Sequence, residues 1–187
     1  MNSIESLVNS VNPMTVGHYT KPHKYALLLA IIDLFDEGLL RTNCLILDDE
    51  LESSFHQKIR SLDPNLNEHD ALIEYPFYFL SKDGYWTFKV KPGKEAEFCR
   101  ITSELKERFT KRRIKETVEC ALLSAEFMSI LSDKHARALL KNALLNRYFC
   151  MCREDFVQND MGKSPNRCYC DYLSSLISTN ICNENAI

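Results

Sequence analysis

The sequence predicts a mainly α-helical domain with a small β hairpin or sheet, an α+β fold built around one buried Leu-rich helix. Three features support this prediction. Apolar residues recur at helical spacing over most of the chain, an apolar run extends from Tyr25 to Phe35, and the runs suited to strands are few and short. The chain has 187 residues, of which 45% are hydrophobic and 26% are charged. It is therefore long enough to bury a sizeable core.

The first elements are predicted from helical spacing and from proline and glycine. Ile4–Val11 predicts a short first helix that ends at Asn12-Pro13. Pro22 suits the start of the next helix because its missing N–H has no intrahelical partner there. The residues that follow, as far as Phe35, are apolar on nearly all faces, which predicts a helix buried in the middle of the domain. Gly38 is the candidate for its C-terminal cap.

A strand and a one-sided helix are predicted next. Asn43–Leu47 is a short apolar run of the kind that forms a strand. The helix after it is predicted over Glu50–Arg60, with Asp48 or Asp49 as the N-cap. The polar stretch from residue 61 to residue 69 is predicted to be a loop.

Two aromatic runs predict a β-hairpin. They are Ile73–Leu80 and Tyr85–Val90, and Asp83-Gly84 between them supplies the backbone angles that a tight turn needs. Pro76 makes the first arm either an edge strand or an irregular segment, since proline cannot donate to a ladder. From Lys94 to Leu123 the chain is charged, and its apolar residues recur at three and four residue steps. This segment is predicted to be helical.

The C-terminal part predicts one more long helix and then an extension. The helix is expected over Asp133–Phe149, and periodicity fades beyond Cys150. We therefore expect one domain at residues 1–149 and a cysteine-containing extension at residues 150–187. No apolar run is long enough to cross a bilayer, and the N-terminus does not resemble a signal peptide, so we expect a cytoplasmic protein.

The chain has eight cysteines. In a protein of this size with no signal peptide, reduced thiols are expected, and Cys44, Cys99 and Cys120 are expected to pack in the core.

Four cysteines near the C-terminus leave two interpretations open. They are Cys150, Cys152, Cys168 and Cys170. Four thiolates would suit a tetrahedral zinc site, but each pair has one intervening residue where zinc sites usually have two. Unligated thiols are favoured, and no cofactor is expected.

A basic run is the strongest compositional indication of nucleic-acid binding. Its members are Lys106, Arg108, Lys111, Arg112, Arg113 and Lys115. On a helix, Lys111 and Lys115 share one face and Arg108 and Arg112 share another, so two rows could follow a phosphate backbone. The alternative is a solvated helix face balanced by neighbouring glutamates. The net charge of −3 gives no overall attraction to nucleic acid.

The segments HKYALLLA, from His23, and YPFYFLSKDGYW, from Tyr75, carry a resemblance to a known family. The sequence there resembles the sulfur-binding domain found at the front of HNH-type restriction endonucleases of the McrA type, which recognise phosphorothioate-modified DNA. The later stretch LSDKHARALLKNALLNRYF is similar to the segment that closes this domain. The resemblance covers residues 15–149, roughly.

The resemblance implies a module that binds double-stranded DNA and recognises one phosphate in which sulfur replaces oxygen. It assigns His23 and Lys24 to the phosphate, and Tyr75, Pro76 and Phe79 to a recess for the sulfur. Sulfur accepts hydrogen bonds poorly, so an apolar recess favours it where oxygen would lose hydration. The implied role is the reader of a modification-dependent restriction system in antiphage defence.

No catalytic constellation is found in the sequence. An HNH nuclease needs a metal-binding histidine and a general-base histidine, and no histidine follows Cys150. We therefore expect a reader without its own nuclease, whose partners would be duplex DNA and either a separate nuclease or a second copy. Two alternatives remain: a degenerate relative that binds plain or base-modified duplex, and a protein-interaction domain that docks through the aromatic segment.

Overall fold

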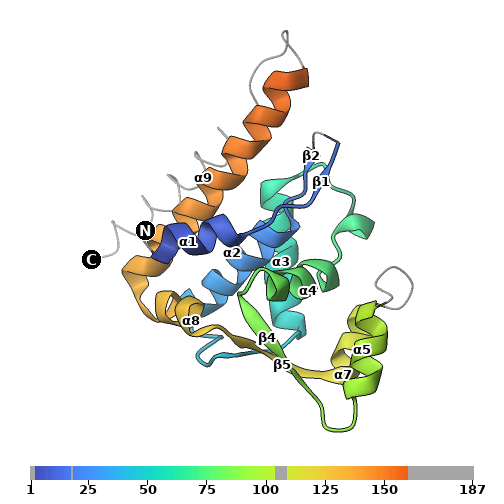
Figure 1. The fold of residues 1–187 in the computed structure, drawn as a ribbon. Coiled ribbons are helices and arrows are strands. Elements are labelled where there is room, and N and C mark those ends of the chain that lie inside the picture. Colours follow the sequence, from blue (N-terminus) through green and yellow to red (C-terminus); the bar gives the residue numbers. More distant parts are fainter. Residues whose placement is uncertain (1–2, 18, 104–108, 160–187) are drawn as a thin grey trace.

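The computed structural model describes residues 3–17, 19–103 and 109–159 (Figure 1). Over these residues it contains eight α-helices, one 3-10 helix and five short strands, which confirms the predicted mainly helical fold with a small sheet. The helices are α1 (Ser3–Ser10), α2 (His23–Asp36), α3 (Asp49–Leu62), η1 (Glu68–Asp70), α4 (Glu74–Lys82), α5 (Glu95–Ser103), α7 (Lys111–Thr117), α8 (Ala125–Ser132) and α9 (Lys134–Asn159). The strands are β1 (Thr15–Val16), β2 (Tyr19–Thr20), β3 (Cys44–Leu45), β4 (Trp86–Val90) and β5 (Val118–Leu123).

Helix α2 is the buried axis of the domain, as predicted. Every residue from His23 to Ile32 is at most 6% exposed, because α3, α4 and α9 pack around it (Figure 1). Gly38 follows the helix with a φ of +71°. Its N–H donates to the carbonyl of Phe35, and the N–H of Leu39 donates to that of Leu34. This is a Schellman ending, so Gly38 terminates the helix as predicted.

Charged groups fasten the neighbours of α2 to it. Asp33 accepts hydrogen bonds from Lys58 of α3 and from Lys141 of α9, the latter at 2.8 Å. Asp48 caps α3 by accepting from the N–H of Leu51 at 2.9 Å. One carboxylate of the axis thus joins three helices.

The predicted hairpin is wrong in its first arm. Residues 74–82 form helix α4, in which Pro76 stands in the first turn, where a missing N–H leaves no bond unmade. Gly84, with φ +91°, ends this helix: the N–H of Tyr85 donates to the carbonyl of Leu80, and that of Gly84 to Ser81. The Asp-Gly pair therefore serves a helix C-terminus, a position that favours the same glycine conformation as a hairpin turn.

The second arm is a strand, but its partner is distant in sequence. β4 pairs antiparallel with β5, which also pairs with β3, so the order is β3-β5-β4. The continuous helix predicted from Lys94 to Leu123 is therefore wrong. It is replaced by α5, α7 and the central strand β5. Apolar and polar residues alternate only weakly along β5, because strands lie on both of its edges and most of its side chains are covered. Its buried residues are Val118, Cys120, Ala121 and Leu123.

The reduced state expected for Cys44 and Cys120 is also wrong. The two residues form a disulfide between β3 and β5, with their Cα atoms 5.7 Å apart. The prediction was made from the size of the chain and the lack of a signal-peptide pattern, and residues 118–123 were expected to be helical. Once they form a strand beside β3, two cysteines 76 residues apart come within bonding range. Cys99 is a free thiol, exposed instead of packed in the core.

Helix α9 continues to Asn159, ten residues beyond its predicted end. The domain boundary proposed at Cys150 therefore falls inside a helix. Among the described residues, none of the helices has both the length and the apolar character that a bilayer crossing requires.

Candidate functional site

The two segments that carry the family resemblance lie together. His23 and Lys24 open α2, and Tyr75, Pro76 and Phe79 belong to α4, which packs against α2 (Figure 1). The ammonium nitrogen of Lys24 lies 5.6 Å from the centre of the Phe79 ring. The fold thus brings together residues separated by about fifty positions in the sequence.

Lys24 is engaged inside the protein. Its ammonium nitrogen lies 2.7 Å from Oδ2 of Asp83, and the two side chains are only 5% and 8% exposed. The same oxygen accepts from the backbone N–H of Asn12 at 3.2 Å. Asp83 directly follows α4, so this pair ties the start of α2 to the end of α4. A lysine held in this way has little freedom to reach a phosphate outside the protein.

His23 is also buried, and its ring is neutral. Nε2 lies 2.7 Å from the carbonyl oxygen of Asp70, so Nε2 donates. Nδ1 is buried and has no hydrogen-bond partner among the described residues. Burial lowers the pKa of His23 below its ordinary value, although the bond to Asp70 acts in the opposite direction. His23 therefore supplies no positive charge near neutral pH.

Helix α4 has one half-exposed aromatic edge. Pro76, Phe77 and Tyr78 are buried, whereas Tyr75 and Phe79 are half-buried and share a face because they are four residues apart. The Tyr75 ring lies 6.2 Å from that of Phe109, between centroids. The side chains assigned to the sulfur recess thus comprise one buried proline and two partly accessible rings.

The basic run is partly neutralised. Lys106 and Arg108 lie outside the described residues. Lys111 approaches Glu52 of α3 at 2.5 Å, and Lys115 approaches Asp49 at 3.2 Å, so the face that these two lysines share is turned toward α3. Arg112 points away, with its side chain 81% exposed and Glu116 at 3.7 Å.

Basic residues are concentrated in one segment of the chain, a signal that the sequence contains but that was not used to predict the site. From Lys82 to Glu116 there are eleven Lys and Arg against six Asp and Glu. This basic segment therefore has a net charge of +5 in a chain whose total is −3. Within it, α5 and α7 pack together at the end of the molecule that also holds the β4–α5 turn (Figure 1). This concentration of positive charge is visible when the charged residues are counted over the segment, and it is hidden in the net charge of the whole chain.

The suggested zinc ligands are only partly described. Cys150 and Cys152 lie on α9, two residues apart, so their side chains point in different directions and do not form half of a common thiolate site. Cys168 and Cys170 lie outside the described residues. Over the described part of the chain, no group of three or more His, Cys, Asp or Glu is arranged to hold a metal ion.

Comparison of the sequence with protein-family models and with curated proteins gives no match. The resemblance to the sulfur-binding domain therefore depends on its short motifs.

Proposed function

We propose that this chain binds the backbone of duplex DNA through the basic segment, residues 82–116, and reads a phosphorothioate linkage at the exposed edge of α4. The observation that carries the proposal is the formal charge of +5 in this segment within an otherwise acidic chain. Lys89, Lys111 and Lys115 pair with carboxylates outside the segment, so its other cations are the ones available to phosphates. Local positive charge gives affinity for phosphates without sequence preference, whatever the sign of the remainder.

Within the basic segment, two arginines are the best candidates for phosphate contacts. Arg100 of α5 and Arg112 of α7 are both exposed. The pair between Arg112 and Glu116 is solvent-exposed, and such pairs contribute little. A guanidinium can also hold a phosphate with two parallel hydrogen bonds, which an ammonium cannot.

Sulfur recognition is the finer part of the proposal, and it is supported by the family resemblance. Tyr75 and Phe79 present apolar ring surface on one face of α4. Such surface tolerates sulfur better than a hydrated oxygen. In this proposal Lys24 holds α4 in position through Asp83, and the cations that touch DNA come from the basic segment.

The test is a fluorescence-anisotropy titration of unmodified duplex and of duplexes with one phosphorothioate in either stereochemistry, at several salt concentrations. We expect binding of all duplexes to weaken with salt, and one stereoisomer to bind more tightly than the unmodified duplex. Absence of binding at the lowest salt would contradict the proposal. If a defined dimer or protein complex were found instead, the protein-interaction alternative would be favoured.

Two sets of variants separate the two roles. Arg100→Ala combined with Arg112→Ala should weaken all duplexes alike and reduce the salt slope by about two. Its control is Arg60→Ala, an exposed arginine on α3 outside the basic segment. Tyr75→Ala should remove only the preference for sulfur, with the exposed Leu72→Ala as its control. If the unaltered protein bound all duplexes with equal affinity, DNA binding would be supported and sulfur recognition would be contradicted.

A further inference from the structure

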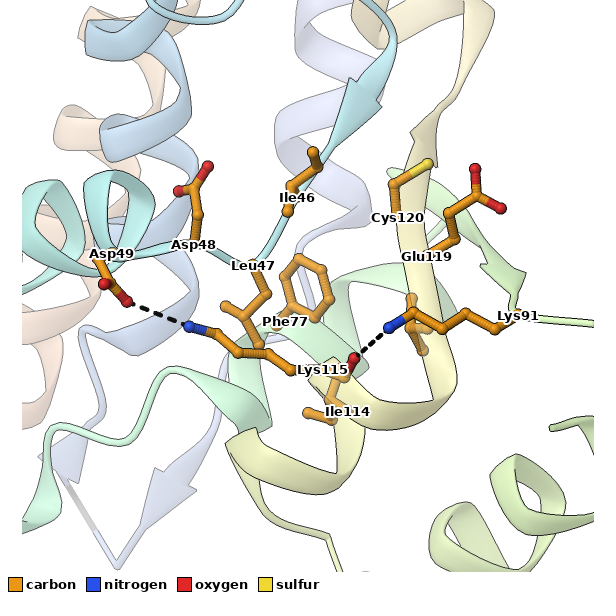
Figure 2. A pocket seen from close by; sticks show the side chains of 11 residues that line it. Ile46, Leu47, Asp48, Asp49, Phe77, Lys91, Ile114, Lys115, Glu119 and Cys120 are labelled. Carbon is orange, nitrogen blue, oxygen red and sulfur yellow. Dashed lines mark hydrogen bonds and ion pairs between the residues drawn. The ribbon is translucent and has the colours of Figure 1, made fainter.

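A hollow of about 360 Å³ lies between the β3–α3 connection and the α7–β5 corner (Figure 2). Its floor is apolar. Leu47, Phe77, Ile114 and Val118 line it and are each at most 6% exposed. This volume is within the range of small-molecule sites, which are commonly about 300–1,000 Å³.

Three carboxylates line the hollow, and each is already engaged. Asp48 accepts a hydrogen bond from a backbone N–H of α3 at 2.9 Å. Asp49 lies 3.2 Å from the ammonium nitrogen of Lys115, and Glu119 lies 2.7 Å from that of Lys89. Asp49 and Glu119 therefore each have a cationic partner, whereas Asp48 is held as the N-cap of α3 by a neutral N–H.

Lys91 differs from the other charged groups of the hollow. Its ammonium nitrogen donates to the backbone carbonyl of Lys115 at 2.7 Å, and Figure 2 shows the side chain reaching toward that residue. Among the described residues, no carboxylate forms an ion pair with Lys91. An ammonium group has three donors, so two remain, and a neutral carbonyl does not cancel the charge. Lys91 is half-buried beside the apolar floor, where a charge attracts an anion more strongly than in open water.

We propose that this hollow binds a small organic monoanion, a carboxylate carried on a flat or short apolar body. The carboxylate would lie against the ammonium group of Lys91, and the body would lie over Leu47 and Val118, the floor residues that keep some exposed surface. A monoanion fits better than a dianion, because one cation is uncompensated and three carboxylates stand at the rim. This site goes beyond DNA binding and does not depend on it.

The probe is 3-phenylpropionate, titrated into the isotope-labelled full chain and followed by the backbone amide signals in NMR spectra. Saturable shifts should concentrate at residues 46–49, 91 and 114–120. The neutral match, 3-phenylpropionamide, should bind at least about tenfold more weakly, because a hydrogen bond to a charged group is lost. Shifts scattered over the surface, no shifts, or equal binding of the two compounds would overturn the proposal.

Lys91→Met should weaken 3-phenylpropionate binding by about tenfold or more and leave the amide unchanged. The control is Lys94→Met, which removes a nearby lysine whose charge is already paired with Glu97. Unchanged carboxylate binding in Lys91→Met would overturn the assignment. The comparison of acid and amide on the unaltered protein decides the same question if the variant does not fold.

Discussion

Two lysines of this protein, Lys24 and Lys91, have opposite surroundings. Lys24 is 4% exposed, and its ammonium group is matched by the carboxylate of Asp83. Lys91 is half-buried, and within the part of the chain that the structure describes its ammonium group meets only a backbone carbonyl. The family resemblance pointed to Lys24 as a ligand-binding residue, whereas no motif marked Lys91.

The difference shows that accessibility and charge balance decide which lysine can bind a ligand. A lysine that already has a buried carboxylate partner must break that pair before it can hold another anion, and breaking it leaves an uncompensated charge inside the protein. A lysine held by a carbonyl loses no ion pair when an anion arrives. Lys24 therefore fits a structural role, and Lys91 fits a binding role.

The largest effect should come from breaking the pair of Lys24. Asp83→Ala leaves a buried ammonium group unpaired, so the free energy of unfolding should fall by about 3–5 kcal/mol. Urea unfolding followed by circular dichroism measures it. A loss below about 1 kcal/mol would show that Lys24 is free to act elsewhere.

A double variant serves as the control for this prediction. Lys24→Met combined with Asp83→Leu removes both charges and fills similar volume. Since replacing a buried ion pair by apolar residues is often neutral, the double variant should be clearly more stable than Asp83→Ala alone.

Reduction of the Cys44–Cys120 disulfide should have the next largest effect. Cys120 lines the hollow that contains Lys91, so this test probes the frame around the second lysine. Loss of a bridge across a long loop usually destabilises by about 2–4 kcal/mol. The unfolding midpoint of Cys44→Ser combined with Cys120→Ser should fall below that of the oxidised protein. Equal midpoints with and without a dithiol reductant would contradict this expectation.

Acid should weaken the region of Lys24 through its neighbour. Burial lowers the pKa of His23, so the unfolded chain takes up a proton at a higher pH than the folded chain. The free energy of unfolding should therefore fall as the pH drops below about 6.5, by at most about 1.4 kcal/mol per pH unit from this group. His23→Gln should flatten this slope in urea titrations between neutral and mildly acidic pH.

The smallest effect is expected for Lys91→Met. Counting the described residues, the variant loses one bond to a carbonyl and leaves no partner charge unpaired. The free energy of unfolding should change by less than about 1.5 kcal/mol. Thermal unfolding of Lys91→Met beside Lys94→Met measures it, and a loss as large as that of Asp83→Ala would erase the contrast between Lys24 and Lys91.

Elements with strong local signals were predictable from the sequence. The continuous apolar run after Pro22 identified α2 as the buried axis, and Gly38 marked its end. In both cases the decisive physics lies within a few residues, because a helix and its cap are local structures.

Elements that depend on distant partners were not predictable. β5 is a strand because β3 and β4 lie on either side of it, at a separation that no local pattern encodes. In α4, proline and Asp-Gly fit a helix first turn and a helix end as well as they fit a hairpin, and tertiary packing decides between them.

The candidate site was also predictable only in part. The sequence indicated that the start of α2 and the segment from Tyr75 belong together, and they do pack together. It did not indicate that Asp83 neutralises Lys24, or that the lysines of α7 face the acids of α3. Charge pairing depends on how the helices pack, and the packing is not visible in residue spacing.

The disulfide divides the chain into a covalent ring and two arms. The ring, from Cys44 to Cys120, holds α3, α4 and α5 together with α7, whereas α2 precedes it and α9 follows it. If one peptide bond inside the ring is broken, the disulfide still joins the two parts of the chain. If a peptide bond in either arm is broken, the Cys44–Cys120 bridge does not connect the severed piece to the rest. Helix α2, the axis of the domain, thus lies in an arm and is held against the ring by packing and by the ion pairs of Asp33. The helix at the centre of the core is therefore not enclosed by the disulfide.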